Sequence, residues 1–104
     1  MIIQVNTDNH IQGKEELNTY VNNLFNEKLQ RFDSYLTRIE VHLSDENGGG
    51  KAGADDKKCN IEARLENLDP IFISSQSDDI SKALHDGLAK IKRAIEHQLD
   101  KVKN

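Results

Sequence analysis

Two segments with strictly alternating apolar and polar residues most constrain how this chain can fold. In residues 37–44 (TRIEVHLS) every second side chain is apolar, and residues 59–67 (CNIEARLEN) repeat the pattern. The apolar positions are Ile39, Val41 and Leu43 in the first segment and Cys59, Ile61, Ala63 and Leu65 in the second. A period of two with one polar face is typical of antiparallel strands covered on one side only. The sequence therefore predicts a sheet with one face against the core and one face open to water.

Two further strands and two helices complete the predicted order of elements. Residues 2–6 (IIQVN) form a short β-branched run, and residues 70–77 (PIFISSQS) form a strand whose first residue, Pro70, needs no N–H. The first helix should begin after Gly13 and end near Asp33 or Ser34, and the last should follow the N-cap candidates at 77–79. Their apolar residues recur at helical spacing: Leu17, Val21, Leu24, Phe25 and Phe32 in the first, and Ile80, Leu84, Leu88, Ile91, Ile95, Leu99 and Val102 in the last.

The order β-α-β-β-β-α predicts a two-layer α+β domain with a four-stranded sheet and both helices on one face. The first β-α-β unit should be a right-handed crossover, and the next three strands a meander. The length of 104 residues suits one domain, residues 1–104, with one core. The side chains expected inside are Ile39, Val41, Ile61, Ala63, Leu84, Leu88, Ile91 and Ile95.

The sequence carries no signal for a membrane or for an oxidising compartment. No apolar run approaches the length of a membrane span, and the N-terminus lacks the basic and apolar regions of a signal peptide. The single cysteine, Cys59, cannot form an internal disulfide. We therefore expect a cytoplasmic protein.

The glycine-rich stretch SDENGGGKAGADDKKC (44–59) resembles a ligand-binding loop only superficially. Gly48 and Gly53 have the glycine spacing of a phosphate-binding loop, but Ala54 and Asp55 stand where the lysine and the hydroxyl are needed. Asp45, Asn47 and Asp56 fit positions 1, 3 and 12 of a calcium loop, but the bidentate glutamate and the flanking helices are missing. We expect no nucleotide or metal here, and a mobile connection over residues 45–57.

No group of residues forms a recognisable catalytic constellation. The four histidines, at positions 10, 42, 85 and 97, include no pair at the helical spacing of a metal site. Cys59 falls on the apolar side of its strand, and no serine lies in a nucleophile elbow. The sequence therefore predicts a protein that is not an enzyme and that holds no metal or cofactor.

Charge is distributed unevenly along the chain. Residues 87–104 contain five basic and two acidic residues, a net of +3, which leaves −7 for the rest because the total is −4. At 100° per residue, Lys90, Arg93, His97 and Lys101 fall within an arc of about 80° on the side of the last helix away from its apolar line. Such a stripe can be an ordinary solvated face, or it can follow a phosphate backbone by point contacts.

Three stretches resemble one known protein family. Residues 28–43 (KLQRFDSYLTRIEVHL) resemble the end of its first helix and its second strand, and residues 44–65 resemble the loop and third strand of a short subgroup. Residues 78–95 (DDISKALHDGLAKIKRAI) resemble its final helix, with an aspartate cap and a Lys-apolar-x-Arg step. The family is that of the ribosome hibernation-promoting factors and ribosome-associated inhibitors, also called the sigma-54 modulation protein family.

The resemblance implies binding and not catalysis. Members occupy the mRNA and tRNA channel of the small ribosomal subunit, inhibit translation and protect idle ribosomes during stress. Basic side chains on both helices contact 16S rRNA, so the resemblance implies such contacts for Lys90, Arg93, His97 and Lys101 on the last helix and Arg31 on the first. A monomer without a small-molecule substrate is expected.

A second hypothesis comes from a different class of function. The chain is more acidic than typical members of the family, with a net charge of −4. It could be an interaction module of the same fold that has lost RNA binding. Such a module would hold a protein partner through the acidic loop or through the polar side of the sheet, which carries Arg38, Glu40, His42, Glu62 and Arg64.

Overall fold

A computed structural model describes residues 1–46 and 56–102 of the protein. It contains four strands, two α-helices and one short 3₁₀ helix in the predicted order. The strands are β1 (Ile2–Thr7), β2 (Leu36–Asp45), β3 (Lys57–Leu65) and β4 (Ile71–Ser77), and the helices are α1 (Lys14–Leu29), η1 (Gln30–Phe32) and α2 (Ile80–Val102). In the described residues, no helix combines the length and apolar character needed to cross a membrane.

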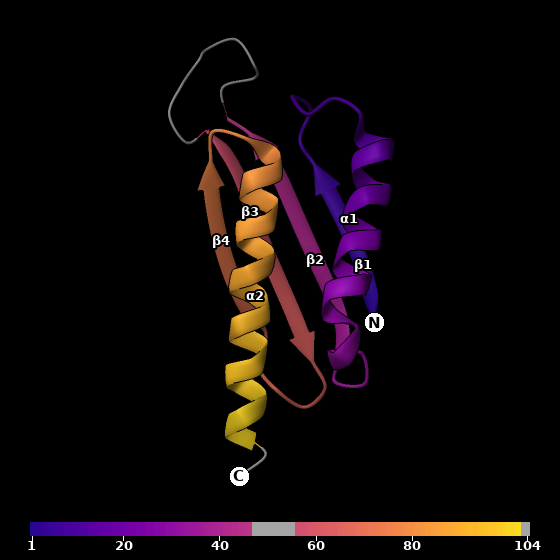
Figure 1. Ribbon diagram of the computed structural model, residues 1–104, viewed down its shortest axis with the longest axis vertical. Helices are drawn as coiled ribbons and strands as arrows, with labels where there is room; N and C mark the ends of the chain where they lie inside the picture. The colour runs from indigo at the N-terminus through magenta and orange to yellow at the C-terminus, as the bar shows by residue number, and fades with distance from the viewer. Residues whose placement is uncertain (47–55, 103–104) are drawn as a thin grey trace.

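The strands form one mixed sheet in the order β1-β2-β3-β4 (Figure 1). β1 pairs with β2 in parallel, with Val5 opposite Val41, whereas β2, β3 and β4 pair as an antiparallel meander. This arrangement confirms the predicted meander. It leaves β1 and β4 as the two edge strands of the sheet.

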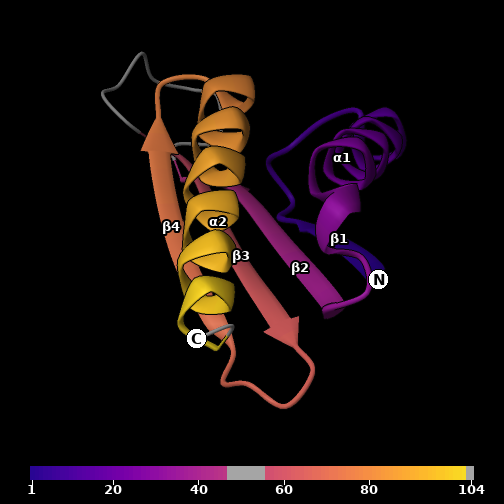
Figure 2. The same ribbon diagram turned by 60° about the horizontal axis from the view of Figure 1, so that its bottom comes forward.

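Both helices cover the same face of the sheet, as predicted. Figure 1 shows α2 running along β3 and β4 while α1 lies beside β1, and Figure 2 shows the two helices on one side of the sheet from a second direction. All eight side chains expected inside are buried. Among residues 1–46 and 56–102, no helix lies over the opposite face of the sheet, which agrees with the alternation of polar residues along β2 and β3.

Local features explain where the first helix begins and ends. Gly13 is the N-cap of α1 with a φ of 66°, a left-handed conformation that glycine adopts without a steric penalty. At the other end, the chain tightens into η1, so that Phe32 packs in the core from a 3₁₀ turn and not from the α-helix. The strand β2 begins at Leu36, one residue before the predicted start.

The helix α2 lies close to the sheet at one glycine. A Cβ at Gly87 would lie 3.1 Å from Cys59 Sγ and 3.1 Å from Ile61 Cδ1, both on β3. Cys59 is itself fully buried, as its position in the alternation predicted. A small residue at position 87 therefore sets how closely the second helix approaches the third strand.

The predicted boundaries of the glycine-rich connection were wrong at both ends. Asp45 and Lys57 were assigned to it, but they face each other as the last pair of the β2–β3 ladder. Both side chains are mostly covered, and Lys57 Nζ lies 3.3 Å from Asp45 Oδ1. The strands thus extend further than the apolar alternation indicated. The central part of the predicted mobile segment, residues 47–55, lies outside the described residues.

Candidate nucleic-acid interface

The predicted basic stripe is exposed along one flank of α2. Lys90, Arg93, His97 and Lys101 are all exposed, and all four lie on the same helix. The buried residues of α2 are on the opposite side of the helix and face the sheet: Ala83, Leu84, Gly87, Leu88, Ile91, Ile95 and Leu99. The amphipathic pattern thus holds four titratable or basic groups on a rigid element, where a long anionic ligand can contact them together.

The first residue of the stripe contacts the edge of the sheet. Lys90 Nζ donates to the backbone carbonyl of Ser74 on β4 at 3.2 Å, and it lies 3.3 Å from Asp86 Oδ2, one turn earlier on α2. We expected this stripe to stand well away from the sheet, and at Lys90 that prediction was wrong. The reason is that a four-carbon side chain on the flank of α2 reaches around to the carbonyls of the neighbouring edge strand.

Asp86 is held in its charged form between a strand and two basic side chains. Ser75 Oγ donates to Asp86 Oδ2 at 2.7 Å. This hydrogen bond, followed by the hydrogen bond from Lys90 and the nearby charge of Arg93, lowers the pKa of Asp86 below its ordinary value. Part of the charge of the stripe is therefore balanced by a fixed carboxylate, and Lys90 must exchange that carboxylate for a ligand phosphate.

Three of the four residues of the stripe form no ion pair in the part of the chain that the structure describes. Arg93 lies near enough to Asp86 to influence its pKa but does not pair with it. His97 and Lys101 likewise have no ion-pair partner among residues 1–46 and 56–102. These three side chains can therefore bind an anion without first leaving a carboxylate, whereas Lys90 cannot.

Arg31 does not join the other predicted contact residues. Its guanidinium forms an ion pair with Glu96 Oε2 at 2.6 Å and lies 4.5 Å from the centre of the Phe32 ring. Glu96 is six residues after Lys90, which places it about 240° further around α2. The structure thus places four of the five predicted residues along α2, whereas Arg31 lies on η1 and contacts α2 at Glu96, on the side of Arg93 away from Lys90 and Lys101.

The flank of α2 that carries Glu96 faces α1. Besides the Arg31–Glu96 pair, Tyr20 on α1 and His85 on α2 are joined by a hydrogen bond of 2.8 Å between Tyr20 Oη and His85 Nε2. Sequence analysis missed both contacts, because their partners are 65 residues apart along the chain and no local pattern links them. These two exposed polar contacts link α2 to the first helical segment above the sheet.

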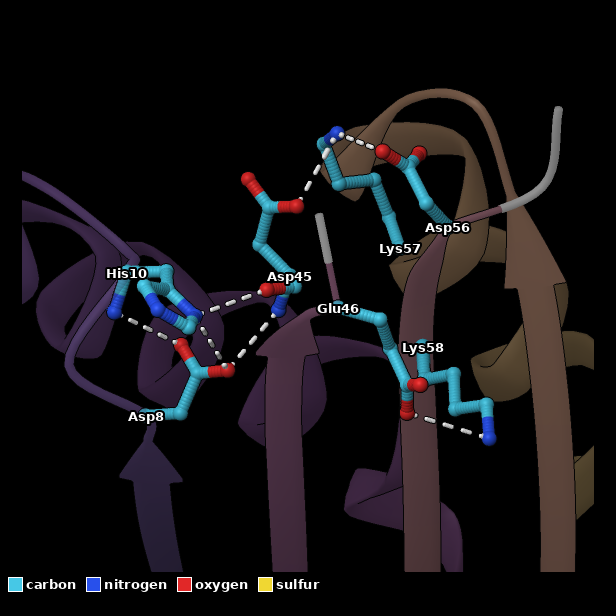
Figure 3. Close-up of polar contacts among 7 residues, drawn as sticks. All are labelled: Asp8, His10, Asp45, Glu46, Asp56, Lys57 and Lys58. Carbon is cyan, nitrogen blue, oxygen red and sulfur yellow. Dashed lines mark hydrogen bonds and ion pairs between the residues drawn. The ribbon is translucent and has the colours of Figure 1, made fainter. Parts of the chain in front are cut away.

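Charged residues beside the glycine-rich connection bind one another (Figure 3). Lys57 Nζ lies 3.0 Å from Asp56 Oδ2, and Lys58 Nζ lies 3.1 Å from Glu46 Oε1. The hydrogen bond to Asp56 is the largest cause of a raised pKa at Lys57. Neither lysine is available as a free cation, so we expect both to contribute little to binding a polyanion.

A second set of contacts in Figure 3 ties β1 to the end of β2. The Asp8 carboxylate accepts hydrogen bonds from the backbone N–H of Asp45 at 3.0 Å and of His10 at 3.1 Å. His10 Nδ1 lies 3.0 Å from the carbonyl oxygen of Asp45. The Asp8 carboxylate thus satisfies two backbone N–H groups, so its role here is to close the ends of β1 and β2.

The described residues contain neither a metal-binding cluster nor an exposed thiol. No three His, Cys, Asp or Glu side chains within residues 1–46 and 56–102 are placed to hold a metal ion together. Burial raises the pKa of the Cys59 thiol to about 12, and the nearby Asp86 carboxylate adds to this effect. The thiol is therefore protonated and inert at neutral pH.

Comparison with solved structures finds similar folds, including those of two proteins. The N-terminal domain of protein Y from Thermus thermophilus is 15% identical with a TM-score of 0.71, and the match covers 93% of this chain and 98% of that one. A ribosomal subunit interface protein from Coxiella burnetii is 19% identical with a TM-score of 0.63, covering 99% and 98%. Comparison with curated protein sequences gives no match.

The sequence itself matches a family over almost its whole length. Residues 3–103 match the family described as sigma-54 modulation protein / S30EA ribosomal protein. The match includes every strand and helix except the first residue of β1. The chain therefore belongs to the sigma-54 modulation protein and S30EA ribosomal protein family, a family of ribosome-associated factors.

Proposed function

We propose that this protein binds the small ribosomal subunit, occupies its mRNA and tRNA channel, and so inhibits translation and keeps idle ribosomes in hibernation. Membership of a ribosome-associated family over residues 3–103 is the observation that carries this proposal. The structural neighbour described as a ribosomal subunit interface protein, at 99% coverage of this chain, points to the same kind of partner. The protein would act in the cytoplasm, as a monomer, on 16S rRNA.

The mechanism would be occlusion. A packed α+β domain that fills a channel excludes mRNA and tRNA by its volume, and no bond is made or broken. The exposed flank of α2 would supply contacts to rRNA phosphates, led by Arg93 and Lys90, with His97 and Lys101 further along the helix. Arg31 would join them on the other flank only if a phosphate replaced Glu96 as its partner.

The negative net charge of the protein would then make its binding to the ribosome more selective but weaker. The net charge of −4 repels nucleic acid in general, so binding has to come from shape complementarity at one site together with local contacts on α2. This is the physical difference between a factor that recognises a ribosomal site and a protein that coats any RNA.

Co-sedimentation with purified 30S and 70S particles at low salt tests the proposal. Wild type should pellet with the particles, whereas the double variant Lys90→Glu/Arg93→Glu should remain in the supernatant. The matched control is Lys14→Glu/Lys82→Glu, which makes the same change in net charge at two exposed lysines outside the stripe and breaks only the exposed Lys82–Asp78 ion pair. The control should pellet like wild type.

Two outcomes would contradict the proposal in different ways. If the Lys90/Arg93 variant pellets as well as wild type does, the stripe is a solvated face and the ribosome contacts lie elsewhere. If wild type itself does not pellet at low salt, the chain does not bind ribosomes. The hypothesis of an interaction module with a protein partner then replaces this one.

A further inference from the structure

The uncovered face of the sheet carries charges that are already balanced. Arg38 pairs with Glu40 at 3.1 Å, and Arg64 pairs with Glu62 at 2.8 Å, so these four side chains sum to no net charge. Such a face has little attraction for a polyanion as a whole. Any ligand for it has to be recognised by stacking and by directed hydrogen bonds.

One aromatic side chain on this face is largely exposed to solvent. Phe72, on the edge strand β4, is 71% exposed, the largest exposure among the large apolar side chains that the structure describes. It lies opposite Glu62 in the β3–β4 ladder, and Ser74 lies opposite Asn60 one step further along the same face. A phenylalanine in this position buries little of its ring in the protein's own core, so the ring is accessible to a ligand.

The ring borders a hollow of about 380 Å³ on the open face. Beside Phe72, the polar side chains that line it are His42, Asn60, Glu62 and Ser74, from β2, β3 and β4. This volume is within the range of small-molecule sites in proteins, which combine an apolar surface with a few directed polar groups. The hollow therefore has the size and composition to take one planar polar ring.

The polar groups in the hollow are held in place by their neighbours. The Glu62 side chain is only 14% exposed, and its Oε2 accepts a hydrogen bond from Arg64 Nε at 2.8 Å. Ser74 Oγ donates to Asn60 Oδ1 at 2.7 Å, which orients the Asn60 amide so that its N–H groups remain donors. A ligand thus meets a fixed carboxylate acceptor next to a fixed amide donor.

We propose that this hollow binds one unpaired guanine base of single-stranded RNA, stacked on Phe72. Guanine presents a carbonyl oxygen followed by two adjacent N–H donors on its Watson–Crick edge. The carbonyl would accept from Asn60, and the two donors would bind the Glu62 carboxylate. Recognition of splayed-out bases by aromatic stacking and edge hydrogen bonds is the usual way in which proteins read single-stranded RNA.

The other bases fit this arrangement less well. Adenine and cytosine each place a ring-nitrogen lone pair beside their single amino group, and that lone pair would face the Glu62 carboxylate. Uracil has one N–H between two carbonyl oxygens, so it offers a single donor. Guanine alone matches a carboxylate with two neighbouring donors, which is the reason for committing to it.

One residue, Ser74, contacts both the hollow and the basic flank of α2. Ser74 lines the hollow with its side chain, and its carbonyl accepts from Lys90 Nζ at 3.2 Å. An RNA strand crossing the β4 edge could therefore place a base on Phe72 and the adjoining phosphate at Lys90. The choice of RNA as ligand rests on the proposed function, but the hollow itself stands on the geometry of β3 and β4.

The first test is a titration of the full isotope-labelled chain with nucleoside monophosphates, followed by NMR. Guanosine monophosphate should shift the amide signals of Asn60, Glu62, Phe72 and Ser74, and the monophosphates of adenosine, cytidine and uridine should shift them much less. Equal shifts with all four nucleotides, or shifts confined to α2, would overturn the proposal.

The second test uses an RNA pentamer with one guanosine among uridines, measured against a pentamer of uridines alone. Phe72→Ala should weaken binding of the guanosine pentamer about tenfold, given the usual contribution of base stacking. Glu62→Gln should abolish the preference for guanosine. The control Ile2→Ala removes another exposed apolar side chain, 61% exposed on the opposite edge strand, and should change nothing.

The two proposals can fail separately. If the guanosine preference is present but wild type does not pellet with ribosomes, the hollow is correct and the ribosomal function is wrong. If ribosomes bind and neither Phe72→Ala nor Glu62→Gln changes pentamer binding, the hollow is wrong. Concentration-dependent dimerisation that Phe72→Ala abolishes would likewise overturn it, because the ring would then cover a second copy of the chain.

Discussion

At the scale of single residues, the structure distinguishes basic side chains that are free from those already engaged. Arg93 has no ion-pair partner in the described residues, whereas Lys90, Arg31 and Lys57 each contact a carboxylate. Exposed ion pairs contribute little to stability, so these pairs mainly determine how much each cation must give up before it can bind an anion. The sequence pattern alone does not distinguish the free basic side chains from the paired ones.

Cys59 leads to a prediction about stability at alkaline pH. The folded thiol has a pKa of about 12 against an ordinary value of 9.0, so above pH 9 the unfolded chain releases a proton that the folded chain keeps. The free energy of unfolding should therefore fall by about 1.4 kcal/mol per pH unit above pH 9 from this group, and the fall should end near pH 12. Urea unfolding at pH 8 and pH 10 measures the effect.

The control for this prediction is Cys59→Ala. The variant is expected to be less stable at every pH because it leaves a small cavity, but its stability should depend less on pH between 8 and 10 than that of wild type. An identical pH dependence in the two proteins would show that the thiol does not titrate as its burial requires.

At the scale of elements, the approach of α2 to β3 depends on Gly87. A side chain there would meet Cys59 and Ile61 at 3.1 Å, so Gly87→Leu should overpack the layer between helix and sheet. We expect a loss of about 1–3 kcal/mol in the free energy of unfolding, measured by urea denaturation. Ala89→Leu, at an exposed position two residues later, is the matched control and should cost less than about 0.5 kcal/mol.

The bridge between the two helices leads to a prediction about binding. Glu96 holds Arg31 at 2.6 Å, and replacing it by glutamine removes one negative charge and releases the guanidinium. If Arg31 contacts rRNA, Glu96→Gln should bind 30S particles several-fold more tightly at low salt, as measured by pelleting at a series of protein concentrations. Glu66→Gln, which makes the same change at an exposed residue after β3, should have a smaller effect.

A loss of affinity in Glu96→Gln would point the other way. It would mean that the bridge between α1 and α2 fixes the binding surface and that Arg31 acts by orienting the helix. Arg31→Ala should then weaken binding to the same extent as Glu96→Gln, because each removes the same contact.

At the scale of the whole molecule, the number of phosphate contacts should be small. A protein with a net charge of −4 and one exposed basic flank can neutralise about three phosphates. The logarithm of the affinity for 30S particles should then fall with the logarithm of the salt concentration at a slope of about −2 to −3. Pelleting between low and moderate salt measures this slope, and a value much steeper than −3 would indicate a larger interface than α2 provides.

The arrangement of the elements was predictable because it is encoded locally. Apolar residues alternate strictly in residues 37–44 and 59–67 and recur at helical spacing from Ile80 to Val102. These patterns decide which side chains are buried, and burying them packs the helices against one face of the sheet. Gly13 and the turn after Asp33 likewise act through their own backbone preferences. The ends of β2 and β3 were not predictable in this way, because Asp45 and Lys57 are polar and only their pairing with each other continues the ladder.

The sequence by itself determined the α+β order, the eight side chains predicted to be buried and the basic flank of α2, since each depends on neighbours within a few residues. Only the tertiary structure decided which of those cations are free and what lies beside them. Lys90 contacts Ser74, which is 16 positions away in the sequence, and Arg31 contacts Glu96 on another helix. Phe72 lines a hollow formed by residues of three strands. Contacts of this kind depend on where distant segments come to rest, and no local pattern of residues contains that information.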